Sequence, residues 1–109
     1  MDDKQFDDAF TATGGWFFLV QYEEIADFNG DTKDLVNHIF SNRNDNLKGR
    51  KFDSKKSGTQ TRVSSALRLI RNKRDKEALE KIRDSQIINS QHPEAKEKAS
   101  KILAKRFNK

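Results

Sequence analysis

The side chains with the greatest potential for chemistry are a group of carboxylates near the start of the chain. A nuclease could use such a cluster to hold Mg²⁺ and activate water. Adjacent residues on a helix point about 100° apart, however, and no strand that carries an acid and a lysine accompanies this group. We therefore interpret the group as solvated charge or as a surface for a basic partner. It consists of Glu23, Glu24, Asp27 and Asp31.

The histidines and the absence of cysteine exclude several kinds of metal site and catalytic group. His38 follows Asp34 by four residues, a spacing that permits a hydrogen bond or a two-ligand metal contact, but no third ligand is in evidence. The chain has no cysteine, which excludes zinc–thiolate sites, iron–sulfur clusters and thiol catalysis. Its glycines form no Walker-type phosphate loop. The sequence therefore predicts no catalytic residue, no metal and no cofactor, and an enzyme is the less favoured interpretation.

Charge is distributed unevenly along the 109 residues. The net charge is +5, but residues 1–31 carry eight acidic residues against Lys4 alone, a net charge of −7. Residues 32–109 carry 21 basic and nine acidic residues, a net charge of +12. Residues 43–74 alone hold eleven basic residues against two aspartates. Such a basic segment attracts polyanions, unless it is only a solvated face or the acidic third covers it in the fold.

The segment 58–74 has the spacing of an amphipathic helix. Val63, Ala66, Leu67 and Ile70 lie at i, i+3, i+4 and i+7, which is one face of an α-helix. Hydroxyl, amide and guanidinium groups collect on the opposite face, and these groups suit phosphate and base-edge contacts. The polar side consists of Thr61, Ser64, Ser65, Arg68 and Asn72.

Two geometries could bring this chain to a nucleic acid. In the preferred one, the 58–74 helix enters a groove while the preceding basic loop follows the backbone, with Thr59 at the positive end of the helix. In the other, residues 17–42 form a helix-turn-helix-like unit in which Thr32, Lys33, Asn37, His38 and Asn42 contact bases. The turn length favours the second geometry, and the charge favours the first. The predicted contact residues are Lys48, Arg50, Lys51, Lys55, Lys56, Thr59, Arg62, Ser64, Ser65, Arg68, Arg71, Asn72, Lys73 and Arg74.

The fold class follows from composition and periodicity. With 33% hydrophobic and 36% charged residues, five glycines and one proline, the chain suits helices that each bury a stripe. We expect one all-α domain over residues 1–109, a compact bundle of four to five short helices. A long basic loop over 43–57 should separate the second helix from the third. Residues 1–12 would be a frayed or helical lead-in.

Several local features set the expected helix boundaries. Gly14-Gly15 should interrupt the first helical segment, with Thr11 or Thr13 as an N-cap. The apolar run 16–22 could be a strand by propensity, but we expect the central helix because no partner strand is evident. Asn29 or Gly30 should take a left-handed conformation before a helix over 32–42. Helices are also expected over 75–84 and from Pro93 onward, with the pattern broken over 86–91.

Together these features favour a non-enzymatic nucleic-acid-binding domain, with DNA preferred over RNA as the partner. The alternative is a protein-interaction module, such as a small inhibitor, adaptor or accessory subunit of a nucleic-acid enzyme. It would dock through its basic face on an acidic protein surface, or through its acidic first third. No run approaches the roughly 20 apolar residues of a membrane span, so we expect a cytoplasmic protein without membrane contact. A homodimer is compatible with either interpretation.

Overall fold

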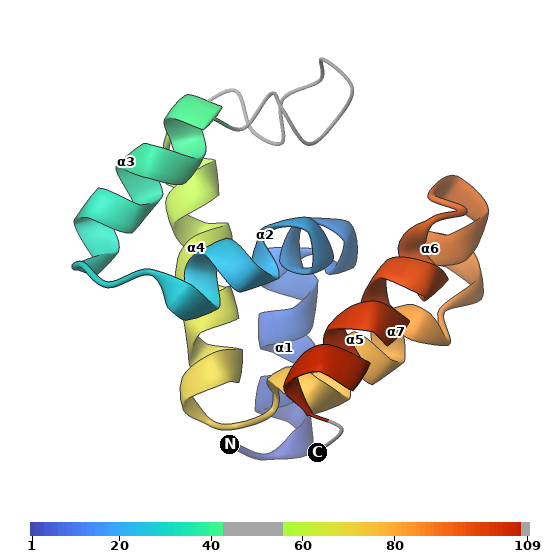
Figure 1. The fold of residues 1–109 in the computed structure, drawn as a ribbon. Helices are drawn as coiled ribbons and strands as arrows, with labels where there is room; N and C mark the ends of the chain where they lie inside the picture. Colours follow the sequence, from blue (N-terminus) through green and yellow to red (C-terminus); the bar gives the residue numbers. More distant parts are fainter. Residues whose placement is uncertain (43–55, 108–109) are drawn as a thin grey trace.

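The computed structural model describes residues 1–42 and 56–107, and the regular elements in these ranges are all helices. Figure 1 shows them packed into one globule. The all-α prediction is confirmed, but these ranges hold more helices than the four or five expected. Positions 43–55 of the predicted basic loop lie outside the described residues, and its last two residues already belong to a helix. The helices are α1 (Asp3–Thr13), α2 (Gly15–Asp27), α3 (Thr32–Asn42), α4 (Lys56–Arg71), α5 (Asp75–Arg83), α6 (Gln86–Gln91) and α7 (Ala95–Arg106).

The break between α1 and α2 falls at the predicted glycine pair. Gly14 has φ of +82°, a left-handed value that side chains rarely adopt, and its N–H donates to the Phe10 carbonyl over 3.0 Å. Gly14 is also the N-cap of α2, so the prediction of Thr11 or Thr13 as the cap is wrong. The reason is that α1 continues through Thr13, whose side chain is completely buried.

Helix α2 is the centre of the fold. It packs against α1, α4, α5 and α7, and it crosses α1 and α4 in Figure 1. The aromatic run 16–22 is helical, as expected, because four surrounding helices bury it and no strand is needed to cover it. The buried apolar side chains of α2 are Phe17, Phe18, Leu19, Tyr22 and Ile25.

The link between α2 and α3 differs from the prediction. Phe28 ends α2 in an extended conformation, and neither Asn29 nor Gly30 has a positive φ. The extended link lets the Phe28 ring return toward α3 and stack on His38, with centroids 6.4 Å apart. Asp31 caps the start of α3, since the Asp34 N–H donates to the Asp31 carboxylate over 2.8 Å.

Helix α4 is covered on several sides, because α1, α2 and α3 all pack against it. Val63 and Ala66 of the predicted stripe are completely buried. Leu67 and Ile70 are only half-buried, and Leu69 takes the central place in the core instead. Contact with three helices therefore widens and rotates the buried stripe relative to the one expected from spacing alone.

Helices α5 and α7 pack against each other, with the short helix α6 at one end. The prediction that 86–91 breaks the helical pattern is wrong. Ser85 caps α6, because its hydroxyl accepts from the Ile88 N–H over 3.2 Å. The side-chain amide of Asn89 donates to carbonyls at the end of α5 and to Ser85, which joins the two helices.

A buried hydrogen bond joins α2 to α5. The Tyr22 hydroxyl donates to the Asp75 carboxylate over 2.5 Å, and the two residues are 2% and 9% exposed. Burial, together with this hydrogen bond, raises the pKa of Tyr22 well above its usual value. The phenol therefore stays a donor at all ordinary pH values, and it compensates the carboxylate for lost hydration.

Replacing this donor should destabilise the fold. We expect Tyr22→Phe to lower the free energy of unfolding by about 1–3 kcal/mol, because Asp75 loses its buried partner. Urea unfolding followed by circular dichroism measures the change. In an Asp75→Asn background the same substitution should cost less, because a neutral amide tolerates burial better than a carboxylate. An equal cost in both backgrounds would contradict this role for the bond.

Candidate nucleic-acid interface

The outward side of α4 carries a continuous row of exposed polar side chains. They follow one another at intervals of one, three or four residues, so they share one face of the helix and of the turn after it. No acidic residue occurs among the sixteen residues of α4. This confirms the polar side predicted from spacing, except that Ser65 is half-buried. We define the α4 polar face as Gln60, Thr61, Ser64, Arg68, Arg71 and Asn72.

Thr59 is not part of this face. Its side chain is completely buried, so the prediction that it contacts a ligand at the positive end of the helix is wrong. Thr59 precedes Val63 by four residues and therefore lies on the same inward face of α4. The helix also begins earlier than expected, at Lys56, which moves its N-terminal end away from Thr59.

Arg62 is engaged within the fold. Its Nη1 atom donates to the Thr13 carbonyl over 2.8 Å, and the guanidinium lies over the Phe17 ring, 5.6 Å from the centroid. Gly14 permits this approach, because a Cβ there would lie 2.5 Å from Arg62 Nη1. Arg62 thus fastens α4 to the junction of α1 and α2, and it is less available to a ligand than the sequence suggests.

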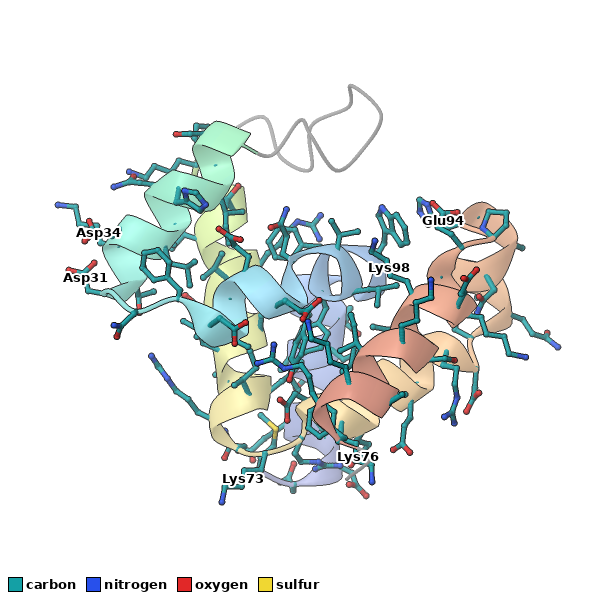
Figure 2. The ribbon with its side chains drawn as sticks, in the orientation of Figure 1. Asp31, Asp34, Lys73, Lys76, Glu94 and Lys98 are labelled. Atoms are coloured by element: carbon teal, nitrogen blue, oxygen red, sulfur yellow. The ribbon has the colours of Figure 1, made fainter. Side chains whose placement is uncertain are left out.

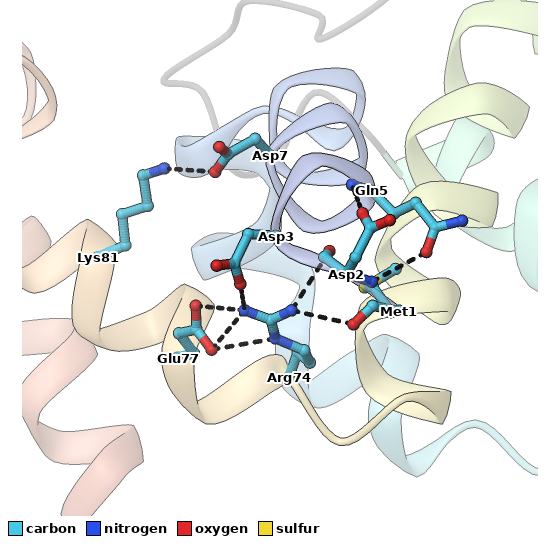
Figure 3. A network of polar contacts seen from close by, with 8 residues as sticks. All are labelled: Met1, Asp2, Asp3, Gln5, Asp7, Arg74, Glu77 and Lys81. Carbon is cyan, nitrogen blue, oxygen red and sulfur yellow. Dashed lines mark hydrogen bonds and ion pairs between the residues drawn. The ribbon is translucent and has the colours of Figure 1, made fainter.

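Arg74 is likewise engaged, at the opposite end of α1 (Figure 3). Its Nη2 atom pairs with Glu77 over 2.7 Å and with Asp3 over 3.1 Å, and its guanidinium lies 4.4 Å from the centroid of the Phe6 ring. Nη1 donates to the carbonyls of the first two residues. The side chain is only 17% exposed. Arg74 therefore holds the start of the chain in place, a role that its predicted phosphate contact did not anticipate.

All eight acidic residues of the first 31 have a partner in the structure. Two cap helices, since Asp2 accepts from the Gln5 N–H and Asp31 caps α3. One pairs locally, Asp8 with Lys4. None of the others pairs with α4. One bonds to the histidine of α3, and the rest pair with cations of α7, of α5 and of the residue before α5. These pairs are Asp3–Arg74, Asp7–Lys81, Glu23–Lys105, Glu23–Arg106, Asp27–Arg106 and Glu24–His38.

The cations on the outer side of α4 have a different environment. Within residues 1–42 and 56–107, no ion pair engages Arg68, Arg71 or Lys73. Lys73 has φ of +58° and follows the end of the helix, where the Arg74 N–H donates to the Leu69 carbonyl. Figure 2 shows Lys73 at the lower end of α4, pointing outward. Acidic residues therefore leave this positive surface uncovered in the described part of the chain.

A groove between α3 and α4 adjoins the α4 polar face at Gln60. Its volume is about 490 Å³, and a lysine from each helix lines it. Lys33 and Lys56 also form no ion pair with another described residue. The lining residues are Thr32, Lys33, Val36, Lys56, Ser57 and Gln60. Thr32 and Lys33, which the helix-turn-helix-like geometry places at the bases, therefore lie beside α4, the helix of the preferred geometry.

The helix-turn-helix-like unit receives less support. α3 packs chiefly against α4, while α2 packs against α1, α4, α5 and α7. His38 bonds to Glu24 and stacks on Phe28, and Asn37 is half-buried. The side chain of Asn42 lies outside the described residues. Of the four residues in this geometry whose side chains are described, Thr32 and Lys33 join a basic surface.

Four predicted contact residues fall in the segment that the structure does not describe: Lys48, Arg50, Lys51 and Lys55.

In the part that the structure does describe, no group of three histidine, aspartate or glutamate side chains could hold a metal ion. None of the helices there is long and apolar enough to cross a membrane. Comparisons with known proteins find no matching family model, curated protein or solved structure.

The pairing of the acidic third with α7 gives a pH-dependent contribution to stability. A hydrogen bond from Arg106 lowers the pKa of Asp27 below its ordinary value of 3.8. A carboxylate with a lowered folded-state pKa stabilises the fold above its unfolded pKa, and this contribution is lost as the pH falls through the folded pKa.

We therefore expect Arg106→Gln to destabilise the protein at pH 7, with the Asp27 pair contributing less than about 1 kcal/mol because the carboxylate is exposed. The difference from the native protein should shrink as the pH falls below the ordinary pKa of Asp27. Urea unfolding at several pH values measures it. Lys98→Gln, which removes one exposed charge from the same helix and breaks no ion pair between described residues, is the control. A difference that is constant with pH would contradict this assignment.

Proposed function

We propose that this protein binds nucleic acid through the α4 polar face. The observation that carries the proposal is the exposed row of arginine, hydroxyl and amide groups on a helix without acidic residues. Carboxylates in the acidic third of the chain pair with cations outside α4. They therefore neutralise little of the positive charge on α4 itself. The positive end of this face is thus open to a polyanion.

The chemistry of the face supports this function. The guanidinium groups of Arg68 and Arg71 present planar sets of donors that match phosphate oxygens or the acceptor edge of guanine. Ser64 and Asn72 are short polar side chains that donate to phosphates or base edges without adding charge. The Thr61 hydroxyl donates to the Ser57 carbonyl over 3.2 Å, and its oxygen remains an acceptor for a base edge. Asn72 already donates to the Arg68 carbonyl, which closes the end of the helix and fixes the position of this part of the face.

The residue types of the predicted basic loop also support nucleic-acid binding. Residues 43–55 carry five basic residues and immediately precede α4. Phosphate contacts by Lys48, Arg50, Lys51 and Lys55 would add to the affinity without specifying sequence.

Removing the two exposed arginines should weaken binding and its dependence on salt. We expect the double variant Arg68→Ala with Arg71→Ala to lower the log–log salt slope by about 0.9 per lost phosphate contact. The affinity should fall by about 1–3 kcal/mol for each arginine that contacts a base. Fluorescence anisotropy with labelled nucleic acid over a salt series measures both quantities.

The matched control is Lys96→Ala with Lys98→Ala. It removes two exposed positive charges from α7, on the other side of the molecule from α4 (Figure 2). If charge alone attracts the ligand, both double variants lose the same affinity. An unchanged affinity and slope in the arginine variant would remove the α4 polar face from the interface.

The second candidate function is a protein-interaction module. Ile87 on the uncharged helix α6 is 72% exposed, which favours a protein contact at that end of the molecule, including a second copy of this chain. The acidic third is a weaker docking surface than the sequence indicated, because its carboxylates are already paired or capping helices. Failure of the purified protein to bind any nucleic acid at low salt would favour this alternative.

A further inference from the structure

The cations around the α4 polar face fall into two groups, one near each end of the helix. Lys33 and Lys56 line the groove beside the first turn of α4. Arg68, Arg71 and Lys73 lie on its last turn and just beyond. Between the two groups the exposed side chains are uncharged, namely Gln60, Thr61 and Ser64.

The two groups lie farther apart than the major groove is wide, so a helix of this length reaches both backbones only if it crosses the groove obliquely. Fifteen residues separate Lys56 from Arg71, and a helix rises about 1.5 Å per residue, so the two ends lie about 22 Å apart. The major groove of B-form DNA is about 12 Å wide and admits an α-helix, with a phosphate backbone on each rim and base edges on its floor. Long lysine and arginine side chains reach from the helix to either rim. The order of basic, uncharged polar and basic side chains matches the order of rim, floor and rim.

We infer that the ligand of this face is B-form duplex DNA, with α4 in the major groove. This inference rests on the proposed function and names its substrate class. Lys33 and Lys56 contact one backbone, while Arg68, Arg71 and Lys73 contact the other. Gln60, Thr61 and Ser64 face the base edges.

The composition of the face argues against single strands. Proteins that hold single-stranded nucleic acid stack its bases on aromatic side chains. Residues 56–73, which span α4 and the following turn, contain no aromatic residue. This face therefore offers an unpaired base no aromatic ring, and only the guanidinium planes of Arg68 and Arg71 to stack on.

The groove dimensions of RNA argue against a double-stranded RNA ligand. An A-form helix has a deep, narrow major groove that side chains do not reach, and its wide minor groove is shallow. A helix that presents its contacts along one straight face suits the wider major groove of B-form DNA. The preference for DNA over RNA thus has a geometric basis that the sequence alone did not provide.

The test compares three ligands of one base sequence: duplex DNA of about two helical turns, duplex RNA and single-stranded DNA. Anisotropy titrations of the full chain over about 50–200 mM salt should show duplex DNA bound about tenfold more tightly than the others, the value of one good base contact. Lys33→Ala with Lys56→Ala should lower the salt slope on duplex DNA by about 0.9 per lost phosphate contact. Lys96→Ala with Lys98→Ala should leave that slope unchanged.

The outcomes separate this inference from the function on which it rests. Single-stranded DNA or duplex RNA bound as tightly as duplex DNA overturns the inference but leaves nucleic-acid binding in place. No binding of any of the three overturns both. An unchanged slope after removal of Lys33 and Lys56 shows that the groove contacts no backbone, and it overturns the two-rim arrangement. Circular dichroism of each variant confirms that the fold is intact.

Discussion

The exposure of positive charge on α4 depends on the ion pairs that the acidic first third makes with cations of α7, of α5 and of the residue before α5. Asp3 and Asp7 bring α1 to Arg74 and Lys81, while Asp27 brings α2 to Arg106. Each pair is modest in energy, since most lie near the surface. Their effect on the charge distribution is larger, because they bring negative charge to positive side chains of α5 and α7 and leave Arg68 and Arg71 of α4 exposed.

The buried centre makes this arrangement possible. The first half of α2 is almost entirely apolar, and α1, α4, α5 and α7 pack against the helix. The hydrogen bond from Tyr22 to Asp75 fixes α5 against α2, and Arg62 fixes α4 against the junction of α1 and α2. With α4 held on one side and α5 and α7 on the other, the outer face of α4 is separated from the paired charges. A packing constraint in the core thus determines which of the described cations remain exposed on the surface.

Periodicity and glycine placement predicted most helices, the break at Gly14 and the polar side of α4, because these depend on local spacing. The partners of individual arginines could not be predicted in this way. Arg62 bonds to a carbonyl 49 residues away, and Arg74 pairs with Asp3, 71 residues away, so no local pattern shows that they are engaged. The role of Lys33 beside α4 likewise appears only when α3 packs on α4. The capping residue Ser85 was the signal that could have indicated α6.

The arginines in the described part of the chain fall into two classes, one engaged within the fold and one exposed on the surface, and we propose that the exposed class binds the ligand. Nuclear magnetic resonance of the arginine side-chain Nε–H groups tests it most directly, during titration with a short DNA duplex. The signals of Arg68 and Arg71 should shift on binding, while those of Arg74 and Arg106 should stay in place. Shifts confined to Arg74 and Arg106, with Arg68 and Arg71 unmoved, would contradict the account and place the ligand on the other side of the molecule.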